Sequence, residues 1–191
     1  MFIQKNKYYI YIENLRSINL NLIKIKRKFS IIYRNSEKNS NLYNLIKFIK
    51  ACRKKHIKFF IANNFALALR TNANGVYLSS YNKELFKTNT KFGKKFEIIG
   101  SAHNFGEINI KKKQGCKSIV LSRLFKTDYK NKKSFYGITK FNLLIKNYRD
   151  CFIALGGIRS KNLMKLKMLN CEGVALLSEV KKKPAIIRRL F

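Results

Sequence analysis

Two adjacent glycines, Gly156 and Gly157, follow the apolar run "CFIAL" and precede a segment with helical spacing. Residues without side chains let backbone N–H groups approach an oxygen closely, and the start of a following helix adds positive potential. Ser178 ends the next apolar run, and its hydroxyl can donate to the same group. The pattern therefore indicates a phosphate site. A tight strand exit is the simpler alternative, because a glycine pair alone is a weak signal.

Other apolar runs also end in polar or small residues. The set is Asn14, Arg34, Asn63, Asn64, Ser79, Ser80, Ser101, His103, Arg123, Thr127, Gly156, Gly157 and Ser178. It contains no carboxylate, which favours anion binding over hydrolysis by paired carboxylates or metal capture by Asp and Glu. His103 can serve as a general base near neutral pH. A lone histidine is more often structural, as we expect of His56 at a helix end.

The segment "LFKTDYKNKKSFYG" (124–137) is the longest loop after any run and contains Lys126, Thr127 and Lys130. It has two open interpretations. It is either a solvated charged loop or a basic flap that closes over a phosphorylated substrate.

Eight short runs rich in Ile, Val, Tyr and Phe must position these residues. They cover 8–13, 30–34, 58–63, 75–80, 96–101, 118–125, 151–157 and 173–178. Several are apolar throughout, which is typical of parallel strands covered on both faces. Helical spacing separates some of them: residues 41–56 place Leu42, Leu45, Ile46, Ile49 and Cys52 on one face, and residues 162–169 repeat the pattern.

We therefore predict a single compact (β/α)₈ barrel domain over residues 1–191, with short helices because this fold usually takes about 250 residues. The carboxyl ends of barrel strands meet at one face, so the strand-end residues should converge there. The alternative is an open doubly wound sheet. That fold normally places a Gly-rich phosphate turn after its first strand, and "YYIYIENLRS" has no glycine.

Lys and Arg total 42 against 9 Asp and Glu, for a formal charge of +33. The basic residues occur along the whole chain together with many Asn and Ile, all of which have AT-rich codons. Compositional drift therefore explains the charge better than a dedicated nucleic-acid site. We expect nucleic-acid binding to be at most non-specific and confined to low salt. The positive field also favours small phosphorylated substrates.

The four cysteines form no C-x-x-C pair, which predicts buried free thiols in a reducing compartment. The N-terminus lacks the apolar core of a signal peptide, and no apolar run approaches the roughly 20 residues of a membrane span. We expect a cytoplasmic protein with no membrane contact, and the oligomeric state stays open.

In order along the chain, "IANNFALAL...ANGVYLSS", "IIGSAHNFGEI", "GCKSIVLSRLFKTDYK", "FYGI" and "IALGGI...NCEGVALLSEV" resemble the thiamine phosphate synthase and thiazole tautomerase (TenI) family of barrels. The resemblance implies that Gly156, Gly157 and Ser178 bind a thiazole phosphate, with Leu177 as a further substrate contact. It implies that Ser101, Thr127 and Lys130 lie near a pyrophosphate or its bridging atoms.

The synthases of this family join hydroxymethylpyrimidine pyrophosphate to a thiazole phosphate, with Mg²⁺ and cationic side chains stabilising the departing pyrophosphate. This sequence departs from their pattern. Of a Gln-x-Arg-x-Lys motif after the second strand it retains only Arg34, with Ile32 and Ser36 in the other places. The two metal-binding aspartates fall on Asn64 and Asn82, and neutral amides bind Mg²⁺ far more weakly than carboxylates. Mg²⁺ is therefore doubtful here.

Three hypotheses follow. The first is a thiamine phosphate synthase of reduced or altered activity, with Ser101, His103 and Lys130 as catalytic residues and Arg34, Asn63, Asn64, Asn82 and Thr127 as substrate contacts. The second is a metal-independent thiazole tautomerase-like isomerase with His103 as its base. The third is a non-catalytic barrel that binds a phosphate ligand or a polyanion.

Overall fold

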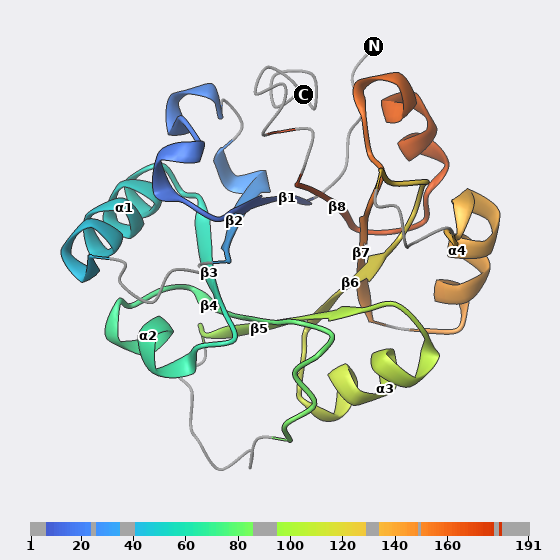
Figure 1. Ribbon diagram of the computed structural model, residues 1–191, viewed down its shortest axis with the longest axis horizontal. Coiled ribbons are helices and arrows are strands. Elements are labelled where there is room, and N and C mark those ends of the chain that lie inside the picture. The colour runs from blue at the N-terminus through green and yellow to red at the C-terminus, as the bar shows by residue number, and fades with distance from the viewer. Residues whose placement is uncertain are drawn as a thin grey trace.

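The eight predicted strands form a closed parallel barrel in sequential order, with β1 paired to both β2 and β8 (Figure 1). This computed structural model describes residues 7–23, 26–34, 41–85, 95–128, 134–148, 150–177 and 180. The predicted (β/α)₈ barrel is confirmed. The open doubly wound sheet is wrong, because its first and last strands would not pair with each other.

The strands are β1 (Lys7–Ile12), β2 (Phe29–Tyr33), β3 (Lys58–Ala62), β4 (Gly75–Leu78), β5 (Glu97–Ala102), β6 (Ser118–Ser122), β7 (Cys151–Leu155) and β8 (Gly173–Leu176). The α-helices are α1 (Leu42–Lys54), α2 (Phe65–Arg70), α3 (Phe105–Lys113) and α4 (Gly137–Lys146). The 3₁₀ segments are η1 (Leu15–Ser17), η2 (Leu20–Leu22), η3 (Lys26–Lys28) and η4 (Ser160–Met168).

Short connections explain how eight strand units fit into 191 residues. Brief 3₁₀ turns stand between β1 and β2. After β7 the predicted helical segment is the 3₁₀ helix η4, which has three residues per turn. Leu163, Leu166 and Leu169 follow that period of three, and all three are buried against the barrel.

Asparagines begin several helices. Asn14 caps η1 and Asn64 caps α2, in each case by accepting a backbone N–H of the first turn on the side-chain oxygen. Asn41 and Asn104 do the same for α1 and α3. A short polar side chain at this position satisfies helix donors that otherwise lack a partner. Part of the Asn-rich composition therefore has a structural use.

Alternate strand residues divide the core into two layers. Tyr8, Ile10 and Ile12 of β1 face the surrounding helices, whereas Tyr9 and Tyr11 fill the barrel interior. Burial on both sides explains why the runs are apolar throughout. The other interior residues are Ile32, Phe60, Tyr77, Ile99, Val120, Ile153 and Ala175.

All four cysteines are thiols outside any disulfide, as predicted, and Cys151 alone among them is only partly buried. Every helix in the described part of the chain is too short or too polar to cross a bilayer. Residues 86–94 and the segment after Val180, which contains Pro184, lie outside the described residues.

Candidate functional site

A cavity of about 600 Å³ opens at the carboxyl ends of the strands. Its lining residues are Arg34, Tyr77, Ser79, Ser80, Tyr81, Ser101, His103, Ser122, Arg123, Thr127, Asp128, Leu155, Gly156, Gly157, Ile158, Arg159, Ala175, Leu176 and Leu177. This is the face of a barrel where ligands bind. Arg34, Arg123 and Arg159 make the lining predominantly cationic.

Most of the predicted site residues meet in this cavity. They are Arg34, Ser79, Ser80, Ser101, His103, Arg123, Thr127, Gly156, Gly157 and Leu177. Lys130 and Ser178, a predicted catalytic and a predicted phosphate-binding residue, lie outside the described residues. Among the described residues, Asn14, Asn63, Asn64 and Asn82 do not line the cavity.

One carboxylate joins the neutral and basic strand-end residues at this cavity. Asp128 lines the cavity and pairs with the guanidinium of Arg159. Both residues lie several positions beyond the strand they follow, so a search confined to strand ends misses them. Tyr77 was missed because it lies within an apolar run, where the alternation along β4 turns its ring toward the barrel interior.

Gly156 and Gly157 have φ values of 103° and 65°, which side-chain-bearing residues rarely adopt. A Cβ on Gly156 would lie 3.1 Å from the Cβ of Arg123, and one on Gly157 would lie 2.6 Å from the carbonyl oxygen of Phe125. The Phe125 N–H also donates to the Gly156 carbonyl at 3.0 Å. The glycines therefore make room for the loop after β6, as the tight-exit interpretation requires, and they line the cavity as well.

The loop after β6 brings unpartnered donors to the cavity. Nε and Nη1 of Arg123 and the hydroxyl of Thr127 are buried without a hydrogen-bond partner in the described structure. Nη2 of Arg123 donates to Ser134 Oγ at 3.2 Å, and Gly156 packs on its aliphatic stem. A buried donor without an acceptor costs about 1–3 kcal/mol. An anionic ligand in this cavity would supply acceptors.

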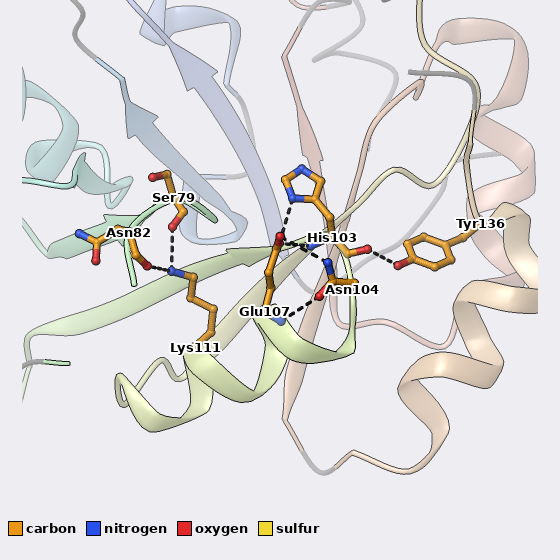
Figure 2. Close-up of polar contacts among 7 residues, drawn as sticks. All are labelled: Ser79, Asn82, His103, Asn104, Glu107, Lys111 and Tyr136. Atoms are coloured by element: carbon orange, nitrogen blue, oxygen red, sulfur yellow. Dashed lines mark hydrogen bonds and ion pairs between the residues drawn. The ribbon is translucent and has the colours of Figure 1, made fainter. Parts of the chain in front are cut away.

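His103 is held at the cavity by the first turn of α3 (Figure 2). Glu107 Oε2 lies 3.0 Å from His103 Nδ1 and also accepts the His103 backbone N–H at 2.7 Å. From the other side, the Tyr136 hydroxyl donates to the His103 carbonyl. Burial, followed by the nearby Glu107 carboxylate, raises the pKa of Tyr136. Because Nδ1 is engaged, Nε2 is the ring nitrogen left for proton transfer.

Asn63 ties the ends of β3 and β4 together. Its Oδ1 accepts the Ser79 N–H at 2.9 Å, and its Nδ2 donates to Ser79 Oγ at 3.2 Å. Its backbone N–H donates to the Tyr77 carbonyl at 2.8 Å, and its φ is 53°. Asparagine tolerates this left-handed conformation better than most residues. Asn63 therefore positions Ser79, which lines the cavity.

The two amides at the implied metal positions do not fit Mg²⁺. Asn64 Oδ1 accepts the Leu67 N–H at 2.8 Å, and Asn82 Oδ1 accepts from Glu84 N–H and Gln114 Nε2 at 3.2 Å each. Both oxygens are thus engaged, and neither carries the charge that Mg²⁺ prefers in its ligands. Across the described residues, no three His, Cys, Asp or Glu side chains gather as a metal site.

The chain is similar to thiamine-phosphate synthases in sequence and in fold. A family model described as thiamine monophosphate synthase matches residues 9–180. A thiamine-phosphate synthase of Prochlorococcus marinus is 30% identical over 149 residues, which are 78% of this chain and 42% of that protein. Another, from Pelagibacter ubique, is 28% identical over 185 residues, which are 90% of this chain and 87% of that protein.

The fold is similar to that of the thiamine phosphate pyrophosphorylase from Pyrococcus furiosus, with a TM-score of 0.70 at 18% identity. That match covers 97% of this chain and 95% of the other. The chain spans 42% of the length of the Prochlorococcus marinus protein described above. It spans 37% of the length of a thiamine-phosphate synthase from another strain of that species.

Proposed function

Because the chain belongs to the thiamine monophosphate synthase family, we propose that it binds a thiazole phosphate and couples it to hydroxymethylpyrimidine pyrophosphate with reduced or altered activity. One observation carries the proposal. In the cationic cavity at the strand ends, buried hydrogen-bond donors of Arg123 and Thr127 have no acceptor in the described structure. Phosphoryl oxygens are strong acceptors for such groups.

Each half of the proposed substrate pair has its own set of residues. Gly156, Gly157 and Leu177, with Ser178 beyond the described residues, hold the thiazole phosphate. On the side of the departing pyrophosphate, the hydroxyls of Ser101 and Thr127 donate hydrogen bonds. Arg34 and Lys130 supply positive charge there. Such fixed donors stabilise a pyrophosphate leaving group without a proton transfer to it.

Metal dependence is where this chain should differ from its relatives. The family is generally Mg²⁺-dependent, whereas Asn64 and Asn82 offer engaged neutral oxygens. Lysine and arginine can stabilise phosphate charge, but they do not bridge its oxygens as Mg²⁺ does. We therefore expect coupling to be low or absent and to change little with Mg²⁺, while thiazole-phosphate binding persists.

The test is a coupling assay with both substrates, with Mg²⁺ or with EDTA, beside a calorimetric titration with thiazole phosphate alone. Arg34→Gln should lower any coupling at least tenfold, and Arg70→Gln, an exposed arginine at the end of α2, should not. Robust synthesis that strictly requires Mg²⁺ would show that our interpretation of the two asparagines is wrong. Failure to bind thiazole phosphate would refute the proposed function itself.

A second candidate is a metal-independent thiazole tautomerase, which is favoured by the His103–Glu107 pair at the cavity. Histidine with an engaged Nδ1 is suited to moving a proton through Nε2. If thiazole phosphate binds and neither reaction occurs, the non-catalytic phosphate-binding barrel is the remaining function. Cysteines that remain thiols rather than disulfides support a reducing, cytoplasmic location.

A further inference from the structure

Lys111 is a fully buried lysine whose ammonium group donates hydrogen bonds to three neutral oxygens. Nζ donates to the carbonyls of Ser79 and Asn82 at 2.7 and 2.6 Å (Figure 2). It also donates to Gln114 Oε1 at 2.9 Å. These three acceptors satisfy the three N–H donors of the ammonium. The group is thus bound in the way that carbonyl oxygens bind a small cation.

The surroundings are shaped for this side chain. A Cβ on Gly100 of β5 would lie 2.8 Å from both Cγ and Cδ of Lys111, so the missing side chain makes room for the lysine stem. Burial lowers the pKa of Lys111, because removal from water disfavours the charged ammonium. A buried charge is tolerated when it is fully hydrogen-bonded, as it is here.

Gln114, at the end of α3, binds the same loop as Lys111, and we call these two side chains the clamp. Its Nε2 donates to Asn82 O at 3.1 Å, to Asn82 Oδ1 at 3.2 Å and to Glu84 O at 2.7 Å. Lys111 and Gln114 together therefore hold the backbone of residues 79–84. This loop supplies Ser79, Ser80 and Tyr81 to the cavity lining.

These contacts hold the positively charged ammonium of Lys111 at 2.6 Å from the carbonyl oxygen of Asn82. Like charges repel strongly away from bulk water. A divalent cation near Asn82 would meet the ammonium, besides finding an amide oxygen that is already engaged.

We propose that the Lys111 ammonium, clamped with Gln114 under residues 79–84, takes the place of a bound metal cation: it positions this wall of the cavity and keeps divalent cations away from Asn82. The proposal rests on the proposed function only for the expectation that a cation would otherwise act in this cavity. The test measures Mn²⁺ affinity and the hydrogen exchange of backbone amides. Its outcome therefore does not depend on whether the protein catalyses a reaction.

The test compares Mn²⁺ binding, followed by the electron paramagnetic resonance of the free ion, in three full-length variants that all carry Asn64→Asp and Asn82→Asp. One has no further change, one adds Lys111→Met, and the matched control adds Lys113→Met. Lys113 is an exposed lysine on the same helix, so its replacement removes the same formal charge. We expect Lys111→Met to raise the Mn²⁺ affinity at least tenfold and Lys113→Met to leave it within twofold.

Gln114→Met in the same background separates charge from loop order, because it loosens the clamp and keeps the ammonium. It should speed hydrogen exchange of residues 79–84 at least tenfold without raising Mn²⁺ affinity. If Lys111→Met does not fold, Lys111→Gln removes the charge and keeps a donor. Equal Mn²⁺ affinity in the Lys111 and Lys113 variants, a rise with Gln114→Met, or tight Mn²⁺ binding by the unaltered chain would each overturn the proposal.

Discussion

A Cβ on Gly157 would stand 2.6 Å from the carbonyl oxygen of Phe125, so the loop after β6 lies directly against the turn after β7. The two loops also exchange a backbone hydrogen bond between Phe125 and Gly156. The proposed phosphate site would therefore be built by packing one loop onto the next. A side chain at Gly157 would displace the loop that carries Arg123 and Thr127.

Replacing Gly157 with alanine should cost more stability than its backbone angle explains. Gly115 is a matched control, because its φ of 74° is similar to the 65° of Gly157 but a Cβ there meets nothing within 4 Å. Gly115→Ala should lower the free energy of unfolding by about 1 kcal/mol, the cost of a left-handed alanine. Gly157→Ala should add about 1–3 kcal/mol for the clash. Equal losses in urea denaturation would refute the packing argument, and Gly157→Val should also abolish thiazole-phosphate binding.

Arg123→Gln should weaken anion binding and leave the fold intact. The guanidinium has two buried donors without acceptors, so it contributes more to a bound anion than to the free protein. We expect at least a tenfold loss of affinity for inorganic pyrophosphate in calorimetry, with the urea midpoint unchanged or higher. Arg70→Gln is the control for general charge. A loss of the same size in both variants would mean that the field of the whole chain, rather than Arg123, binds the anion.

Sequence periodicity predicted the barrel because each strand is buried on both faces and so leaves a continuous apolar run. Strand ends then located most of the cavity lining. The exceptions have physical reasons: Asp128 and Arg159 enter from loops, and Tyr77 enters from the interior of a strand. Lys111 was missed because one lysine among 42 basic residues carries no sign of burial in the sequence. Its burial depends on Gly100, which lies on a neighbouring strand.

Alkaline pH should destabilise the fold through its buried thiols. Burial raises the pKa of Cys52 from 9.0 to about 12, and that of Cys116 likewise. The unfolded chain releases these protons near pH 9 while the folded chain retains them, so the free energy of unfolding falls as pH rises from 9 toward 12. Each thiol contributes a slope of up to about 1.4 kcal/mol per pH unit. Cys52→Ala should make the free energy of unfolding fall less steeply with pH in urea titrations at pH 8.5 to 10.5. An unchanged slope would contradict the attribution of this fall to the buried Cys52 thiol.

Nucleic-acid binding should be weak, indifferent to sequence and lost at moderate salt. The charge of +33 is spread over the whole chain, so it acts through the release of counterions rather than through a shaped surface. Fluorescence anisotropy with two unrelated RNA oligonucleotides should give equal affinities, both abolished well below physiological ionic strength. Selective binding that survives physiological salt would instead favour the polyanion-binding barrel.

The contact between Glu107 and His103 predicts how the tautomerase candidate would respond to mutation. Glu107 holds Nδ1 at 3.0 Å, so Glu107→Gln should misorient the ring and slow proton transfer. If thiazole-phosphate isomerisation occurs, Glu107→Gln should slow it about tenfold in the parent chain and have no further effect when His103→Gln is present, because the carboxylate acts only through the imidazole. Glu97, which pairs with Lys58 in β3, provides the control, and Glu97→Gln should leave the rate unchanged. A Glu107→Gln effect that persists without His103 would show that Glu107 acts through the α3 start alone, and it would remove the support for His103 as a base.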